Sequence, residues 1–322
     1  MYNMRDSNVT FVNPLYFTLL GVPGLESVQH WIGIPFFIMI LLALVGNCTI
    51  LFVIWRDPSL HQPMYLLLAI LAIIDLSIFL VLFPKTLAIL WFNVRDIEFN
   101  ACLTQMFFVH ALAAFEAGIL VAMALDRYVA ICRPLRYTAI LTPQVLLGIA
   151  IIAIMRAVIL SSFCPILIKL RLKSFHSTVV AHSYCEHMAV VKLAVGDIRV
   201  NKFYGLAAIL SVCWCDISFI STSYILIFRA VLRLPGKETR IKAVNTCSAH
   251  ITIIALSYSL GLFSFLAHRY GHHVAPYVHI LLSNIYLLVP PVANPIVYGV
   301  KTKEIRIRVI TMLSLQRQKS KS

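Results

Sequence analysis

The sequence predicts an all-α membrane protein, a seven-transmembrane helix bundle with a short amphipathic eighth helix. Of its 322 residues, 60% are hydrophobic and only 12% are charged, which is far from the balance of a water-soluble globule. The apolar residues gather in seven long stretches, each sufficient for a tilted helix that crosses a bilayer. A disordered chain, a collagen and a disulfide-rich secreted module are excluded, because polar residues are few and the chain has 12 Gly and 8 Cys.

The apolar stretches divide the chain into a tail, a bundle and a basic end. We expect an extracellular N-terminal tail over 1–30, the bundle over 31–299, and a cytoplasmic helix and tail over 300–322. The expected spans are 31–54, 63–90, 101–131, 145–168, 203–228, 244–267 and 274–299. No basic segment with a short apolar run and a small-residue cleavage site opens the chain, so the first span is expected to be retained.

The positions of Lys and Arg predict the orientation in the membrane, because cytoplasmic connections carry an excess of both. Basic residues concentrate in 133–136, 229–242 and 301–321, which we expect on the cytosolic side. The N-terminus is then outside and the C-terminus inside. The long 169–202 loop also holds six basic residues, but long loops are translocated with less regard to charge. The predicted location is the plasma membrane.

The net charge of +14 would suggest a nucleic-acid partner in a soluble protein. Here the basic residues lie in short segments between apolar runs, where they contact lipid headgroups, so membrane lipid is expected and nucleic acid is not. The segment that follows Gly299 alternates basic and apolar residues at helical spacing. It predicts an amphipathic helix on the inner leaflet. On the outer tail, Asn8 begins an N-glycosylation motif with Val9 and Thr10.

The cysteines divide by depth. Cys102, Cys164 and Cys185 are expected toward the oxidising side, and the others lie within spans or near the cytosol. Cys102 at the outer end of the third span and Cys185 in the long outer loop are the predicted disulfide pair, which would fix that loop over the mouth of the bundle. No cysteine or histidine spacing indicates a metal centre.

Ionisable residues inside the spans are the first functional candidates, since they are costly to bury in lipid. Asp75 lies near the middle of the second span, and Glu116 shares one face of the third helix with Arg127. Two inward carboxylates would repel unless one is protonated or a cation lies between them. One interpretation is a bound sodium ion. The alternative, favoured by these residues alone, is that each carboxylate is neutral or hydrogen-bonded.

Two motifs near the cytosolic side are candidates for an activation switch. Asp126, Arg127 and Tyr128 place an ion pair that could exchange partners when helices move, although helix-end ion pairs are common in membrane proteins. Asn294 and Pro295 open the motif that ends at Tyr298, and its proline allows a hinge or a simple kink. No partner is assigned to Arg156 in the fourth span or to Asp216 in the fifth.

The outer end of the sixth span is the candidate ligand site. Counting back from Arg269 by four, seven and eleven residues reaches Phe265, Leu262 and Tyr258, which form one stripe on a helix. A cation then ends an apolar wall roughly 16 Å long, which suits a carboxylate with an aliphatic tail. His110 could line the opposite side. Alternatively, Arg269 reaches headgroups or pairs with Glu186, and His110 is a packed polar residue.

Together with the motifs quoted below, these residues make the sequence similar to a known protein family. The chain is similar to rhodopsin-family G-protein-coupled receptors, and more narrowly to vertebrate odorant receptors of the fish-like class I. The resemblance covers nearly the whole chain. It rests on Gly46-Asn47, LHQPMYLLLAILAIIDLS at 60–77, MALDRYVAICRPLRY at 123–137, SYC at 183–185, KAVNTCSAH at 242–250 and PPVANPIVYG at 290–299.

The resemblance implies a function and a mechanism. A small volatile ligand would bind between the third, fifth and sixth helices, and the sixth helix would then move outward to admit the stimulatory olfactory G protein and raise cyclic AMP. Tyr224 and His250 match switch positions of the family, together with Arg127 and Tyr298. Asp75 and Glu116 match carboxylates associated with sodium, which reverses the preference stated above. Arg269 matches a position where class I receptors are thought to hold carboxylic acids.

The sequence departs from the family pattern at two places, and each departure leads to an expectation. The second disulfide of the outer loop is missing, because His176 and Val195 stand where its cysteines would fall. We therefore expect the 169–182 segment to be looser, and Cys164 is not expected to replace either partner. Phe265 is bulky beside Arg269, so we expect a shortened or narrowed slot that disfavours long-chain acids.

Three other functions are less well supported. A transporter or channel could use the intramembrane carboxylates as an ion path, but paired, interrupted spans are not found. A retinal photoreceptor would need a lysine in the seventh span, and 274–299 contains none. No enzyme is expected, because no set of nucleophile, base and orienting residue stands out.

Overall fold

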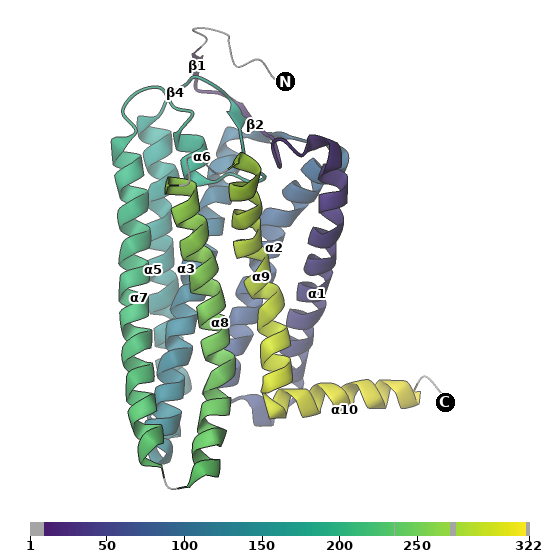
Figure 1. The fold of residues 1–322 in the computed structure, drawn as a ribbon, viewed down its shortest axis with the longest axis vertical. Helices are drawn as coiled ribbons and strands as arrows, with labels where there is room; N and C mark the ends of the chain where they lie inside the picture. Colours follow the sequence, from purple (N-terminus) through teal and green to yellow (C-terminus); the bar gives the residue numbers. More distant parts are fainter. Residues whose placement is uncertain (1–9, 235, 271–274, 320–322) are drawn as a thin grey trace.

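The computed structural model describes residues 10–234, 236–270 and 275–319, without the side chains of 242, 246, 267–270, 276 and 312–319. Seven helices in this part of the chain are long and apolar enough to cross a membrane, and they stand side by side as one bundle (Figure 1). They are α1 (Gln29–Arg56), α2 (Pro63–Phe92), α3 (Phe99–Cys132), α5 (Pro143–Arg171), α7 (Arg199–Arg233), α8 (Lys237–Tyr270) and α9 (Pro276–Lys301). All seven predicted spans are confirmed, and each helix extends past the C-terminal end of the apolar stretch that predicted it.

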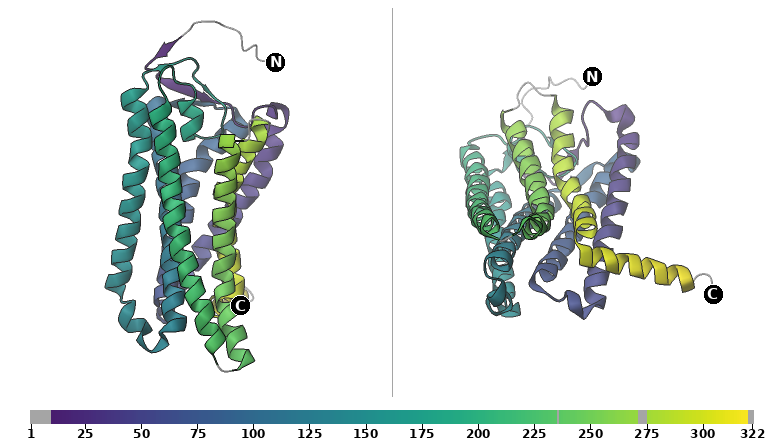
Figure 2. Two further views of the ribbon diagram at one scale, coloured as in Figure 1. Left: turned by 60° about the vertical axis from the view of Figure 1, so that its left-hand side comes forward. Right: turned by 60° about the horizontal axis from the view of Figure 1, so that its bottom comes forward.

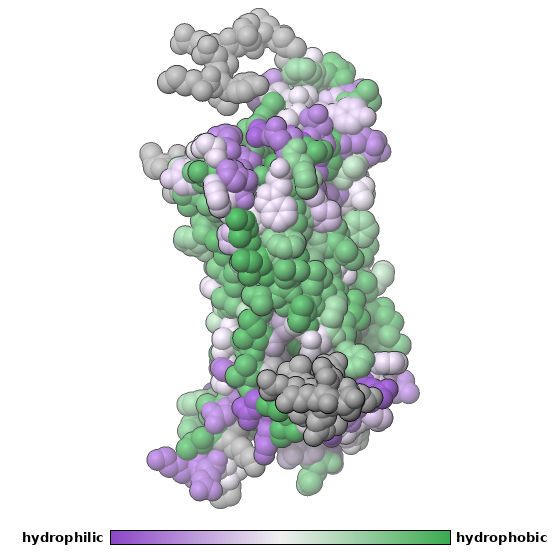
Figure 3. All heavy atoms as spheres, turned by 90° about the vertical axis from the view of Figure 1, so that its right-hand side faces the viewer, coloured by the Kyte–Doolittle hydropathy of each residue, from purple (hydrophilic) through white to green (hydrophobic). Residues whose placement is uncertain are grey.

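The surface has the pattern of a membrane protein. Hydrophobic side chains form a continuous band around the middle of the face in Figure 3, and hydrophilic ones gather above and below it. The last helix, α10 (Lys303–Lys319), turns away from the bundle axis at the lower end (Figures 1 and 2). Arg308 fixes it there, because its Nε lies 2.7 Å from Oδ2 of Asp57 at the end of α1. The predicted eighth helix is confirmed.

The connections at the lower end are short. They contain the helical turns η2 (Pro58–Leu60) and η3 (Pro134–Arg136) and the single-turn helix α4 (Tyr137–Ile140). Asp57 caps η2 by accepting a hydrogen bond from the backbone of Ser59, and Thr142 caps α5 by accepting one from Val145.

Close packing of α1 against α9 depends on a glycine and an asparagine. A Cβ atom on Gly46 would come within 2.7 Å of the Pro295 ring, so a larger residue does not fit there. Pro295 has no N–H, which leaves the carbonyl of Pro291 without its helical donor. The Nδ2 of Asn47 donates to that carbonyl at 2.9 Å. The asparagine therefore satisfies a backbone group that the proline exposes inside the membrane.

The upper end carries a cap made of short strands. One pair joins β1 (Phe11–Val12) to β4 (Ser174–Phe175), and a three-stranded sheet has the order β3-β2-β5. In that sheet β2 (Tyr16–Leu19) is antiparallel to β3 (Asp96–Glu98) and parallel to β5 (Val179–Val180). The N-terminal tail is thus built into the outer loop, and η1 (Glu26–Val28) connects it to α1.

The expectation of a looser 169–182 segment is wrong. Phe175 and Val180 are completely buried, and the ring of Phe175 packs edge-on against Phe17 of the tail. The backbone of His176 donates to Leu193, and that of Val195 donates to Ser174. Strand pairing and burial of apolar side chains thus hold the segment where the disulfide of the family is missing. The sequence pattern concealed this, because the partner strand lies in the tail, far away along the chain.

The predicted disulfide between Cys102 and Cys185 is present, with a Cα–Cα distance of 5.4 Å. Gln105, one turn below Cys102, accepts a hydrogen bond from the backbone of Cys185 at 3.0 Å and donates to the Val81 carbonyl at 3.1 Å. Ser183 contacts Asn284 of α9 by hydrogen bonds of 2.8 and 3.1 Å. The loop is therefore attached to α3 and α9 directly above the bundle.

Candidate functional site

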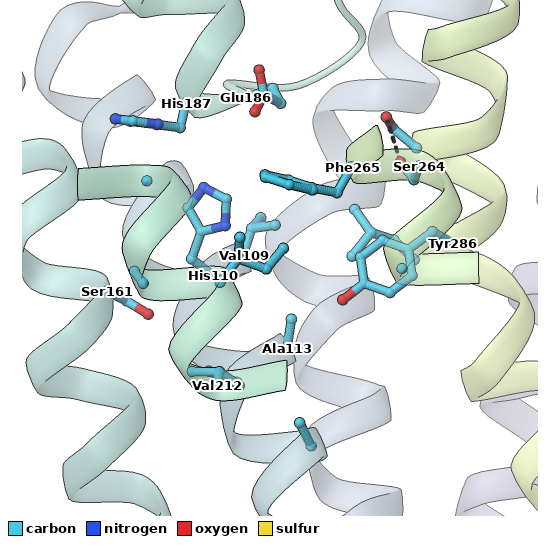
Figure 4. A pocket seen from close by; sticks show the side chains of 18 of the residues that line it. Val109, His110, Ala113, Ser161, Glu186, His187, Val212, Ser264, Phe265 and Tyr286 are labelled. Carbon is cyan, nitrogen blue, oxygen red and sulfur yellow. Dashed lines mark hydrogen bonds between the residues drawn. The ribbon is translucent and has the colours of Figure 1, made fainter. Parts of the chain in front are cut away.

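A cavity of about 500 Å³ opens inside the upper half of the bundle (Figure 4). Side chains of α3, α5, α7, α8 and α9 line it, and the short helix α6 (His187–Val191) of the outer loop covers it. Most of the lining is apolar or small, including Val109, Ala113, Ala117, Val212 and Leu287. A cavity of this volume with a few polar groups has the character of a small-molecule site.

The upper end of the cavity is the most polar part of its wall. His110 on α3 and His187 on α6 face each other there, with ring centroids 6.4 Å apart. Glu186 caps the N-terminus of α6 by accepting a hydrogen bond from the Ala189 backbone at 2.6 Å. Its carboxylate is thereby held beside the histidines. Burial lowers the pKa of the His187 imidazole to about 4, although Glu186 raises it and His110 lowers it further. His187 is therefore neutral at physiological pH.

The predicted stripe on α8 forms one wall of the cavity. Tyr258, Leu262 and Phe265 all line it, and Phe265 points inward toward His110 in Figure 4. Arg269 lies one turn above Phe265 in the last turn of α8, and its side chain is outside the described residues.

The expectation that Phe265 shortens or narrows the slot beside Arg269 stays a prediction, since the Arg269 side chain is not described. The lining of α3 runs from Val109 to Leu120, eleven helical steps, which is about 16 Å of helix.

An ion pair that the sequence analysis left unassigned lies beside the lower part of the cavity. Arg156 of α5 pairs with Asp216 of α7 through both terminal nitrogens of its guanidinium. Nη1 donates to Oδ1, and Nη2 lies 3.1 Å from Oδ2. Tyr258 of α8 donates to the same Oδ2 at 3.2 Å, and Arg156 also donates to the Ala114 carbonyl of α3 at 3.4 Å. Four helices thus meet at Asp216, which is only 1% exposed.

The ion pair could not be assigned from sequence because the rotation of each span about its axis was unknown. A charge of each sign in neighbouring spans was the available signal. Close packing around the ion pair also depends on the glycine at position 118. A Cβ atom there would lie 3.3 Å from Nη2 of Arg156 and 2.9 Å from Cβ of Ala153. Tyr258 has two roles, because its side chain lines the cavity and its hydroxyl contacts the ion pair.

The two intramembrane carboxylates lie deeper. Asp75 is completely buried, and Asn294 donates to its Oδ2 at 2.9 Å. Glu116 is 8% exposed and lines the lower end of the cavity. Three buried oxygens find no hydrogen-bond donor among the described residues, namely Oδ1 of Asp75, Oε1 of Glu116 and Oδ1 of Asn294. Oxygens of this kind are the ligands that a hard cation takes.

The switch candidates at the lower end of the bundle also come together. Arg127 pairs with Asp126, its neighbour on α3, and Tyr137 donates to Asp126 Oδ1 at 2.6 Å, a contact that the sequence analysis missed. Tyr224 on α7 and His250 on α8 lie 2.6 Å apart from Oη to Nδ1. Tyr128 packs against an apolar cluster of Ile227, Val231 and Cys247.

The hinge motif of α9 reaches the same region. The hydroxyl of Tyr298 is 4.0 Å from the sulfur of Met123, and Pro295 lies inside the helix. The side chains of α3, α7, α8 and α9 therefore meet at the lower end of the bundle, below the cavity. Of the remaining predicted residues, Cys164 is a buried free thiol that lines the cavity, and Asn8 lies outside the described residues.

Comparisons with known proteins agree with this architecture. The family model described as olfactory receptor matches residues 36–316. The chain is 53% identical to human olfactory receptor 52A1, over 96% of this chain and 99% of that one. It is 53% identical to human olfactory receptor 52A5, over 95% and 97%, and 50% identical to rat olfactory receptor 51E2, over 93% of each chain.

Among solved structures, squid rhodopsin superposes with a TM-score of 0.69 and 19% sequence identity. The match covers 90% of this chain and 86% of that one. At this identity the likeness concerns the fold, which is the seven-helix arrangement of a rhodopsin-type receptor.

Proposed function

The chain belongs to the olfactory receptor family, and from this premise we propose that it binds small aliphatic carboxylic acids and activates the stimulatory olfactory G protein to raise cyclic AMP. Members of this family are G-protein-coupled signalling receptors and not enzymes, so the cavity is a binding site for an odorant.

The observation that carries the ligand class is the shape and polarity of the cavity. Apolar side chains line most of it, which suits an aliphatic chain, and one group of polar side chains, including His110 and His187, lies at the upper end. Arg269 occupies the turn of α8 directly above this end. A guanidinium there would bind a carboxylate with two parallel hydrogen bonds.

Contacts below the cavity support the proposed signalling. Tyr258 contacts both the cavity and the four-helix ion pair, so a ligand against it would alter how α8 packs on α5 and α7. The lower part of α8 holds His250 against Tyr224. Moving α8 would break this contact and open the cytosolic end, where we place the G protein. In this orientation the disulfide and the strand cap face outward, and the chain is a multi-pass protein of the plasma membrane.

Replacing Arg269 with alanine is expected to abolish the response to aliphatic acids, because the carboxylate loses its charged partner while its tail keeps its contacts. The test is a cyclic AMP dose response to a series of acids, alcohols and esters in cells that carry the stimulatory olfactory G protein, at matched surface expression. Arg269→Lys should retain part of the response. Arg199→Ala is the control, since Arg199 is an exposed arginine at the same end of the bundle. An unchanged dose response in Arg269→Ala would reject the assignment.

We also propose that a sodium ion binds between Asp75 and Glu116. The free oxygens of Asp75, Glu116 and Asn294 fit a hard cation, and a cation would remove the repulsion between two buried carboxylates. When bound, the ion would supply positive charge between α2, α3 and α9. Sodium is then expected to raise the Tm of the purified receptor relative to choline at equal ionic strength, and Asp75→Asn should remove this difference. Equal sodium dependence in both proteins would contradict the site.

A further inference from the structure

The lower end of the cavity carries polar groups that the carboxylate proposal does not use. Glu116 on α3 and Ser257 on α8 both line it, and each is 8% exposed. Neither Oε1 of Glu116 nor Oγ of Ser257 has a hydrogen-bond partner in the part of the chain that the structure describes. Unpaired buried polar atoms are costly. The sodium ion proposed above would satisfy Oε1 of Glu116 but leaves Oγ of Ser257 without a partner among the described residues, which calls for a ligand.

Tyr286 of α9 lines the same cavity, and Figure 4 shows its hydroxyl directed into the cavity. Its ring can lie so close to α8 because residue 261 is a glycine. A Cβ on Gly261 would come within 2.9 Å of the ring. Three helices therefore contribute a carboxylate and two hydroxyls to the wall of a cavity that is mostly apolar.

We propose that Glu116, Ser257 and Tyr286 form a second recognition site, the cavity floor, which binds a hydroxyl group at the far end of the ligand from its acidic head. The preferred ligands are then hydroxy acids and not simple fatty acids. This inference rests on the proposed function, because the acidic head defines which end of the ligand is far from the mouth.

The chemistry of the floor favours a hydroxyl over other polar groups. A hydroxyl donates one hydrogen bond, which the second oxygen of the Glu116 carboxylate can accept, and accepts others, which Ser257 and Tyr286 can donate. An ammonium could donate to the same groups, but it would add a second charge to be desolvated in a cavity that already takes a carboxylate. A second carboxylate would be repelled by Glu116.

The length of the cavity sets the distance between the acidic head of the ligand and its distal hydroxyl. Six residues separate His110 from Glu116 on α3, which is about 9 Å along the helix. An extended chain advances by about 1.2 Å per bond, as it does along a polypeptide backbone. Seven or eight bonds therefore join the head to the floor. This length corresponds to 8-hydroxyoctanoic acid, and octanoic acid is the matched ligand without the distal hydroxyl.

The experiment measures two ligands on four proteins with two readouts. Half-maximal concentrations for 8-hydroxyoctanoic and octanoic acid come from cyclic AMP responses in cells, and ligand-induced shifts in Tm come from the purified full-length receptor. The proteins are the wild type, Ser257→Ala, Ser257→Thr and Ser259→Ala. Ser259 is the matched control, because it is exposed on the same helix and its hydroxyl is hydrogen-bonded to the carbonyl of Leu256.

In the wild type the hydroxy acid is expected to be about tenfold more potent than octanoic acid and to give the larger Tm shift, as expected for a hydrogen bond to a buried charged group. Ser257→Ala should reduce this ratio severalfold toward one, with little change for octanoic acid. Ser257→Thr keeps a hydroxyl and should retain the ratio, and Ser259→Ala should match the wild type.

The outcomes separate the two proposals. If both acids act equally on the wild type, or if Ser257→Ala keeps the ratio, the floor site is wrong and the proposed function stands. If neither acid raises cyclic AMP but the hydroxy acid alone shifts Tm, and Ser257→Ala removes that shift, the floor site stands and the proposed signalling fails. If neither acid acts in either readout, both proposals are overturned.

Discussion

Replacing Arg156 with methionine is expected to destabilise the receptor by about 3–5 kcal/mol, because the buried carboxylate of Asp216 would lose its cation. The Asp216 side chain is 2% exposed, so water cannot replace the guanidinium, and the remaining donor is the hydroxyl of Tyr258. The reverse change, Asp216→Leu, should cost less. It leaves the cation unpaired, but the Arg156 side chain is 28% exposed and keeps its hydrogen bond to the Ala114 carbonyl.

The measurement is thermal unfolding of the purified receptor together with its surface expression. The double variant Arg156→Met/Asp216→Leu should recover much of the loss, since two apolar side chains of similar volume can replace a buried ion pair. Arg199→Ala is the control, because it removes an exposed pair with Asp197 and should not measurably change Tm. A double variant no more stable than Arg156→Met would show that the pair does not act as a unit.

The spans were predictable from sequence because the membrane imposes a simple rule. Backbone groups in lipid must be hydrogen-bonded internally, so a long apolar stretch such as 63–90 can only be a helix. The eighth helix was predictable for a related reason, because the basic and apolar residues after Gly299 alternate at helical spacing. The outer strands were not predicted, since their partners are short and far apart in sequence, as with Phe11 and Phe175.

The site was predictable where one helix determined it. Tyr258, Leu262 and Phe265 share a face by helical spacing alone, and all three line the cavity. Contacts between helices could not be predicted, because they depend on the rotation of each span about its axis. The pairing of Arg156 with Asp216 and the meeting of Glu116 with Ser257 at the cavity floor are of this kind.

Removing the disulfide between Cys102 and Cys185 is the second change with a large expected effect. The two cysteines are 83 residues apart in sequence, and the chain-entropy account of closing a loop of that length gives about 4.5 kcal/mol of stabilisation. Hydrogen bonds from the Cys185 backbone to Gln105 and from Asn284 to Ser183 would still hold the loop locally. We therefore expect a receptor that is poorly displayed at the cell surface but retains its helices.

Because either substitution removes the same bond, Cys102→Ala, Cys185→Ala and the double variant should lose the same amount of stability and of surface display. Adding a reductant to the purified wild type should lower its Tm to the level of the double variant and leave the variant unchanged. Cys215→Ser is the control, since Cys215 is an exposed free thiol. If the double variant reached the surface normally and unfolded at the temperature of the wild type, the loop would owe its position to the strand cap and to Gln105, and not to the disulfide.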